Sequence, residues 1–148
     1  MLKVKITTKF DIPRFDFTKD LTYLAKRVLI PSMAEGIQKG ISIDGGAFPK
    51  LSPATIRMKR NRGLSTKILI ATGKLHRAFI HAVRGMNYVV VTLKSDRKEI
   101  GSFLQIEGIK TRSGRKFFKF FGVSDKAHNE SIKYIKKRIS NLLRKYGK

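Results

Sequence analysis

Three features of this 148-residue chain could take part in catalysis or ligand binding: its histidines, its carboxylates and a glycine-containing turn. The histidines, His76, His81 and His128, show no His-x-x-x-His or other ligand spacing, which favours surface or interface positions over metal binding. The absence of cysteine removes disulfides, thiolate ligands and cysteine nucleophiles, and it fits a reducing cytoplasm. We therefore expect no metal and no cofactor.

The carboxylates offer two candidate acid pairs, Glu35 with Asp44 and Glu99 with Glu107. Paired acids serve acid–base chemistry only when they face one cleft, and nothing in the spacing places either pair together. No serine lies in a Gly-x-Ser-x-Gly context, and the Asp-Gly-Gly turn at 44–46 lacks the Gly-Lys-Ser/Thr of a phosphate-binding loop. The sequence therefore predicts that the chain is not an enzyme.

Positive charge is the dominant property of the sequence. The chain has 33 Lys and Arg against 10 Asp and Glu, a formal net charge of +23. Because so many like charges repel one another, the sequence predicts a polyanion or an acidic protein surface as partner. No acidic residue occurs between Asp44 and Asp96, and the tail over 133–148 is also basic. The candidate contact residues are Arg57, Lys59, Arg60, Arg62, Lys67, Lys74 and Arg77.

The segment Arg-Lys-Phe-Phe-Lys-Phe-Phe at 115–121 has two interpretations. Basic residues interleaved with aromatic ones are used by single-strand and RNA binders, whose aromatic rings stack on bases. The same pattern suits a segment whose alternate phenylalanines fill the core while Lys116 and Lys119 face water, and this second interpretation is favoured.

Hydrophobic periodicity predicts the elements that must position these residues. In the first half of the chain we expect an edge strand over 2–7, a long helix over 18–39 bent at Pro31, and a helix over 53–61 that Ser52 caps. A short helix over 72–85 and a central strand over 86–93 should follow. The last part should contain a short helix around 103–106, a turn at 113–114, an extended segment over 117–121, and a C-terminal helix that Ser124 caps. The apolar stripe of this last helix is predicted to be Ile132, Ile135, Ile139, Leu142 and Leu143.

Length and element order predict one domain, residues 1–148, of the α+β class. We expect a small, mainly antiparallel sheet, a long N-terminal helix, short central helices and a basic C-terminal helix. No stretch approaches 18 apolar residues and the N-terminus alternates apolar with polar residues, so neither a membrane span nor a signal peptide is expected.

The stretch from Gly46 to Leu75 resembles the core signature of the phage virion morphogenesis, or tail completion, family. That signature reads Gly, an aromatic residue, Pro-Leu-Ser-Pro-Ala-Thr, a basic helix, Leu, and Thr-Gly-Arg/Lys-Leu. The resemblance continues more weakly, with Gln105 where the family has histidine, and with Phe118 and Lys119 where it has Arg-Pro. The residues that match the family motif are Phe48, Leu51, Ser52, Pro53, Thr55, Thr72, Gly73, Leu75, Phe120 and Gly122.

This resemblance implies a structural virion protein of a tailed bacteriophage. It would act without catalysis at the neck or head-proximal end of the tail, in tail completion and head–tail joining. It would assemble as a homo-oligomeric ring, a hexamer or a dodecamer, in contact with neighbouring neck and tail proteins and with phage DNA in the lumen. Its expected location is the virion, after assembly in the host cytoplasm. The alternative, which the charge and the 115–121 segment support, is a basic nucleic-acid-binding protein.

Overall fold

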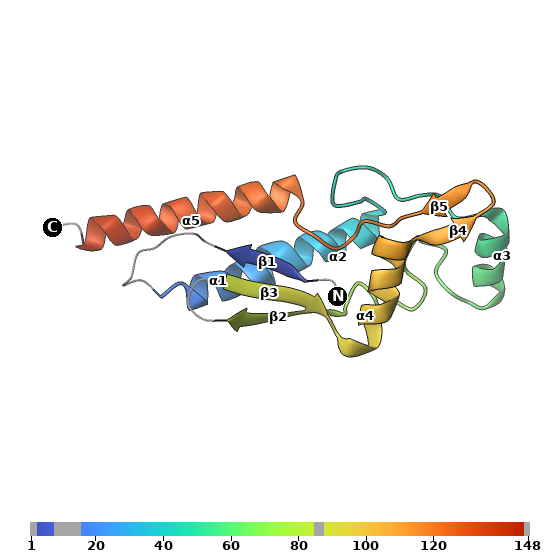
Figure 1. Cartoon of the computed structure of the whole chain (residues 1–148), viewed down its shortest axis with the longest axis horizontal. Helices are drawn as coiled ribbons and strands as arrows, with labels where there is room; N and C mark the ends of the chain where they lie inside the picture. Colours follow the sequence, from blue (N-terminus) through green and yellow to red (C-terminus); the bar gives the residue numbers. More distant parts are fainter. Residues whose placement is uncertain (1–2, 8–15, 85–87, 147–148) are drawn as a thin grey trace.

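The computed structural model describes residues 3–7, 16–84 and 88–146 (Figure 1). This part of the chain is α+β and contains a three-stranded sheet and a separate two-stranded hairpin, both antiparallel. The expected fold class is therefore confirmed. The remainder of the predicted first strand and of the predicted strand over 86–93 lies outside the described residues.

The long N-terminal helix is present from Thr18 to Lys39, in three parts. It consists of α1 (Thr18–Leu24), the π-helical turn η1 (Ala25–Leu29) and α2 (Ile30–Lys39). The π turn directly precedes Pro31, which lies at the start of α2 and removes one N–H from the continuous helical run. Apart from Asp20, the buried side chains of the run are apolar at helical spacing: Leu21, Leu24, Ala25, Leu29, Met33 and Ile37.

The sheet has the order β1–β3–β2, with β1 (Val4–Thr7) and β2 (Phe79–Arg84) on either side of β3 (Tyr88–Leu93). Val4 pairs with Val91, and Phe79 pairs with Leu93. The side chains of β3 alternate between half-buried and fully buried positions, as a strand with one face on the core requires. The predicted edge strand and central strand are both confirmed.

The predicted helix over 72–85 is wrong, because residues 72–77 form turns and 79–84 form β2. Gly73 has a φ of 74°, a left-handed conformation that no first helical turn contains. Phe79 points inward and Ile80 outward, at 7% and 40% exposure, which is the two-residue period of a strand. The apolar residues at 75, 78, 79 and 82 imitate helical spacing, and pairing with β3 overrides it.

The short helix predicted around 103–106 begins earlier than expected. Helix α4 spans Ser95–Ser102 and continues into the π turn η2 (Phe103–Glu107). The first turns of α4 were missed because Ser-Asp-Arg-Lys-Glu has no apolar periodicity. The hairpin of β4 (Ile109–Thr111) and β5 (Gly114–Lys116) follows, with its turn at 112–113, one residue before the predicted turn at 113–114.

The segment over 117–121 supplies aromatic side chains to the core. Phe118, Phe120 and Phe121 are buried, whereas Phe117 is exposed. Phe118 packs at a tilt against Phe48, and Phe121 stacks on Phe79, each pair with ring centroids 6.0 Å apart. The interpretation of this segment as core is therefore confirmed for three of its four phenylalanines.

Helix α5 (Asp125–Tyr146) runs back along the N-terminal helical run in the opposite direction (Figure 1). Ser124 caps it as expected, since its Oγ accepts a hydrogen bond from the Ala127 N–H at 3.3 Å. The predicted apolar stripe is only partly correct. Ile135 is buried and Ile139 and Leu142 pack half-buried against the core, but Ile132 and Leu143 are 39% and 57% exposed.

Candidate partner-binding surface

The most basic predicted contact region is built on α3 (Pro53–Asn61), whose start is set by the Ser-Pro-Ala-Thr block. The Ser52 Oγ accepts a hydrogen bond from the Thr55 N–H at 3.2 Å and lies 2.8 Å from the Thr55 Oγ1. Pro53 occupies the first helical position, where its fixed φ suits the helix and no N–H is needed. These motif residues therefore define where the helix begins.

Lys59 is buried, which corrects the expectation of an exposed basic face at this position. Only 9% of the residue is exposed, and its Nζ donates hydrogen bonds to the carbonyl oxygens of Lys67, at 2.6 Å, and Ile70, at 3.1 Å. Burial lowers the pKa of this ammonium below its usual value. Lys59 thus fastens α3 to the loop that follows it.

The other predicted contact residues are exposed on α3 and on that loop. Arg57, Met58 and Arg62 line a shallow surface hollow of about 410 Å³ together with Ala54 and Asn61. The Arg77 Nε donates to the Gly73 carbonyl oxygen at 3.2 Å, so this side chain is partly held by the turn. The exposed cations of the set are Arg57, Arg60, Arg62, Lys67, Lys74 and Arg77.

The remaining motif residues have structural positions. Phe48, Leu75 and Phe120 lie in the core, and Leu51 and Thr55 are half-buried, whereas Ser52, Pro53 and Thr72 are exposed. A Cβ on Gly73 would approach the Arg77 Nη2 to 2.7 Å, and its positive φ also favours glycine. A Cβ on Gly122 would meet the Ile43 Cδ1 at 2.5 Å.

Gln105 has an anchoring role that sequence reasoning missed. Its side-chain amide donates to the Phe121 carbonyl oxygen at 2.7 Å, and its Oε1 accepts from the Phe121 N–H at 2.8 Å. Both backbone groups of Phe121 are thereby satisfied without a neighbouring strand. A side chain that pairs with a backbone 16 residues away leaves no local sequence signal.

A second missed cluster joins α1 to α5. The Asp20 carboxylate, which is buried, accepts hydrogen bonds from the Tyr134 hydroxyl at 2.8 Å and from the Arg138 Nε at 3.2 Å. Burial, and then the bond to Asp20, raise the pKa of Tyr134 to about 12. Tyr134 also stacks on Tyr23, with ring centroids 4.7 Å apart. This cluster holds α5 against the start of the N-terminal helix.

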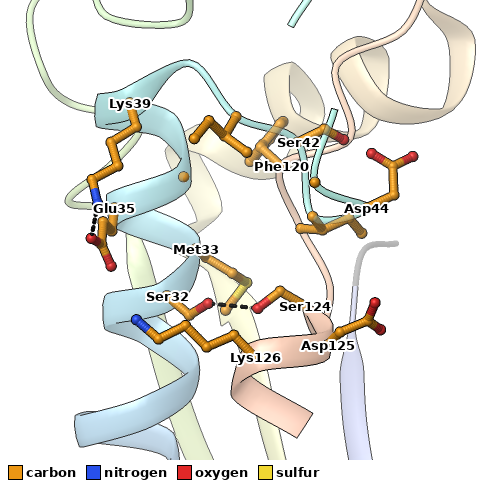
Figure 2. A pocket seen from close by; sticks show the side chains of 14 residues that line it. Ser32, Met33, Glu35, Lys39, Ser42, Asp44, Phe120, Ser124, Asp125 and Lys126 are labelled. Atoms are coloured by element: carbon orange, nitrogen blue, oxygen red, sulfur yellow. Dashed lines mark hydrogen bonds and ion pairs between the residues drawn. The ribbon is translucent and has the colours of Figure 1, made fainter. Parts of the chain in front are cut away.

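A pocket of about 280 Å³ lies between α2, the 41–45 loop and the start of α5 (Figure 2). Its lining includes the apolar side chains of Met33 and Phe120, and the Ser32 and Ser124 hydroxyls are hydrogen-bonded across it at 2.9 Å. Figure 2 shows Glu35 on α2 and Asp44 on the loop at two sides of this pocket. The structure therefore places both carboxylates in the lining of one pocket, at separate sides of it, which the spacing did not predict.

Neither carboxyl of this pair has the property required of a general acid. The hydrogen bond from Lys39 lowers the pKa of Glu35, and hydrogen bonds from Ser42 and then Lys119 lower the pKa of Asp44. A general acid at neutral pH needs a raised pKa, so both groups are suited to ion pairing instead. Lys39 pairs with Glu35, and the Lys119 Nζ lies 3.2 Å from the Asp44 Oδ2.

The histidines are dispersed over the described chain. His128 is exposed on α5, His81 is half-buried in β2, and the His76 Nδ1 is buried with no hydrogen-bond partner among the described atoms. Within the described ranges, no three His, Asp or Glu side chains are grouped so that they could hold a metal ion. None of the helices in these ranges is both long and apolar enough to cross a bilayer.

The fold and surface together define a class of protein, a small and strongly basic α+β protein with six exposed cations on α3 and the loop after it and further exposed cations on its other elements. No protein family, curated protein or solved structure matches the chain.

Proposed function

We propose that this chain is a structural virion protein of a tailed bacteriophage, acting at the neck or head-proximal end of the tail in tail completion and head–tail joining. In this role it works without catalysis, as a homo-oligomeric ring of six or twelve copies whose exposed cations face acidic neck and tail proteins or phage DNA. A ring of such basic subunits needs an anionic neighbour, because close like charges repel one another.

One observation carries the proposal: the two blocks on which the family resemblance depends fold into one unit. The Ser-Pro-Ala-Thr block starts α3, and Lys59 of that helix binds the loop that leads to the Thr-Gly-Lys-Leu block. Phe48 before the first block and Leu75 at the end of the second both enter the core. A shared motif would be expected to have such a joint structural role, and chance similarity would not.

The experiment uses the phage that encodes the chain. Deletion of the gene should leave filled heads and tails unjoined in electron micrographs, and the protein should be present in purified wild-type virions by mass spectrometry. The variant Arg57→Glu, Arg60→Glu, Arg62→Glu should fold but fail to restore infectious titre. The matched control changes three exposed cations elsewhere, Lys26, Lys110 and Arg112, to Glu. Joined, infectious particles without the protein would refute the proposal.

A basic nucleic-acid-binding protein is the second candidate, and the exposed cluster of Arg57, Arg60 and Arg62 on one helix favours it. The aromatic part of this hypothesis loses support, because Phe118, Phe120 and Phe121 are buried and cannot stack on bases. Duplex binding by the purified protein, with an affinity that falls steeply and linearly in log salt and is lost in the same triple variant, would favour this candidate.

A further inference from the structure

Exposed apolar side chains are concentrated on α4 and the π turn that follows it. Ile100, Phe103 and Ile106 are all about half exposed. Ile109, the first residue of β4, and Phe117, which follows β5, are also exposed. We name Ile100, Phe103 and Ile106 the α4 patch. Exposed apolar residues that occur singly are ordinary, but a cluster of them on one element indicates an interface.

A pocket adjoins this patch. It has a volume of about 180 Å³ and lies between the loop containing the Thr-Gly-Lys-Leu block and α4, with Leu69, Leu75, Ile100 and Leu104 among its lining residues. Leu69 has a φ of 57°, a left-handed conformation that is costly for a branched apolar residue. The pocket gives the patch an indentation beside it that can receive a side chain.

Helix α5 carries exposed apolar side chains that could meet this patch. Ile132 and Leu143 are both exposed, and they lie on one side of the helix with Ile139, which is half-buried against the core and leaves only its outer edge accessible. Leu143 is 57% exposed, the same fraction as Ile106 in the α4 patch. We name Ile132, Ile139 and Leu143 the α5 stripe. An amphipathic helix laid on an apolar surface is a common mode of protein recognition.

Charge favours the same pairing. Three of the chain's 10 acidic residues lie on α4 and its π turn, against two cations, Arg97 and Lys98, that are half-buried. Glu99 and Glu107 are exposed and are next in sequence to Ile100 and Ile106 of the α4 patch. No acidic residue follows Glu130 in α5, and Lys133, Lys136 and Arg144 are exposed near the α5 stripe. Opposite charges around two apolar surfaces steer association and set its orientation.

The two surfaces lie toward opposite ends of the molecule's long axis. Figure 1 shows the C-terminal end of α5 at one extreme and α4 in the other half, next to the β4–β5 hairpin. One chain cannot bring its own stripe onto its own patch, but successive copies can do so head to tail. An interface between two different surfaces of identical chains produces rings when the rotation closes.

We infer that the α5 stripe of one copy docks on the α4 patch of the next, and that this contact joins the subunits of the assembly. The inference rests on the homo-oligomeric ring of the proposed function and names the surfaces that form it. Phe103 and Ile106 contact the exposed Ile132 and Leu143 across the interface, while Glu99 and Glu107 face lysines and arginines of α5.

The test begins with two single variants of the full chain, Ile106→Glu on the patch and Leu143→Glu on the stripe. Both side chains are exposed in the single chain, so neither change disturbs the fold, and circular dichroism checks this. Sedimentation velocity over a concentration series should show self-association of the wild type. Each variant should raise the dissociation constant roughly thirtyfold or more, as expected for a central interface residue. Ile80→Glu, at an exposed apolar residue of β2, is the matched control and should associate as the wild type does.

Mixing the two variants decides the geometry. The Ile106→Glu chain keeps an intact stripe and the Leu143→Glu chain keeps an intact patch, so an equimolar mixture should form heterodimers with one working interface and no larger species. Monomers alone in the mixture would overturn the inference, as would a monomeric wild type at every concentration or a variant that associates like the wild type. Any of these results leaves the proposed function to be judged separately, by particle infectivity and by the presence of the protein in virions.

Discussion

Helices α3 and α5 are both strongly basic and both begin at a serine cap, yet they are fastened to the protein in different ways. In α3, Lys59 binds backbone carbonyls that are 8 and 11 residues away in sequence. In α5, Tyr134 and Arg138 bind Asp20 across 114 and 118 residues. The comparison shows that similar composition conceals two roles, since α3 is anchored within its own motif unit while α5 is joined to a distant helix.

This difference determines which cations remain exposed for a partner. The internal bond of α3 uses one ammonium and leaves Arg57, Arg60 and Arg62 exposed. The anchoring of α5 uses the only acidic side chain that is buried in the described chain, Asp20, and fixes the half of the helix that precedes the exposed Leu143. Each helix therefore combines a fixed part with an exposed one.

The largest expected effect comes from breaking the long-range anchor. Asp20→Ala leaves the Tyr134 hydroxyl without its acceptor, so the free energy of unfolding should fall by about 1–3 kcal/mol, measured by urea denaturation. Glu130→Ala, which removes an exposed carboxylate from α5, is the control and should change stability by less than about 0.5 kcal/mol. Equal stability of the two variants would contradict a structural role for the Asp20 cluster.

Breaking the local anchor should have a somewhat smaller effect. Lys59→Met keeps the length of the aliphatic chain but removes both hydrogen bonds to the Lys67 and Ile70 carbonyls, which should cost about 1–2 kcal/mol by urea denaturation. The cost is limited because the substitution also removes a charge that burial disfavours. Arg60→Met on the exposed side of the same helix should leave stability nearly unchanged, and a larger loss there than at Lys59 would reverse our assignment of the two residues.

The two serine caps sharpen the comparison further. Ser124→Ala removes both the cap of α5 and the bond to the Ser32 hydroxyl, and it should cost about 1–2 kcal/mol, whereas Ser52→Ala removes an exposed cap and should cost about 0.5–1 kcal/mol. Ser52→Asp should retain the stability of the wild type because aspartate also caps helices. Thermal unfolding of the three variants would test this order, and a more costly Ser52→Ala would contradict it.

The smallest expected effect is a pH dependence of stability that comes from Tyr134 of α5. Tyr134 has a folded-state pKa raised from 10.0 to about 12, so its contribution is complete below pH 10 and is lost as the pH rises toward 12. The stability difference between the wild type and Tyr134→Phe should therefore shrink across this interval. Lysines titrate there too, but they do so in both proteins and cancel in the difference. A difference that stays constant from pH 9 to pH 12 would show that the tyrosine pKa is not raised.

The sequence predicted the features that depend on short spacings. The bounds of α3 followed from Ser52-Pro53 and Gly63, and the central strand followed from its β-branched residues. The core position of phenylalanines in 117–121 was predicted from their interleaving with lysines, although Phe120 and Phe121, which are consecutive, are both buried. These signals lie within a few residues of the elements they specify, so no knowledge of tertiary contacts was needed.

Features that depend on distant residues were missed. Nothing near Lys59 in sequence shows that its ammonium meets two carbonyls instead of water, and nothing near Glu35 shows that Asp44 lines the same pocket. Strand β2 was read as a helix because its spacing of apolar residues fits both structures until the register with β3 is known. No pattern in the sequence indicated the α4 patch either, because the exposure of its side chains depends on how the chain folds.

The π turn η1 lets the N-terminal helical run hold one extra residue without losing its core face. A π turn contains one more residue than the α-helical turn it replaces, and one residue corresponds to about 100° of rotation about a regular helix axis. Deleting one residue within Ala25–Leu29 would therefore restore regular α-helical winding and leave α2 in the same orientation relative to α1. Met33 and Ile37 would keep their places in the core, and Ser32 would still face Ser124. The same deletion inside α2, where no π turn can absorb it, would rotate every later residue of the helix by about 100° and take Ile37 off the core face.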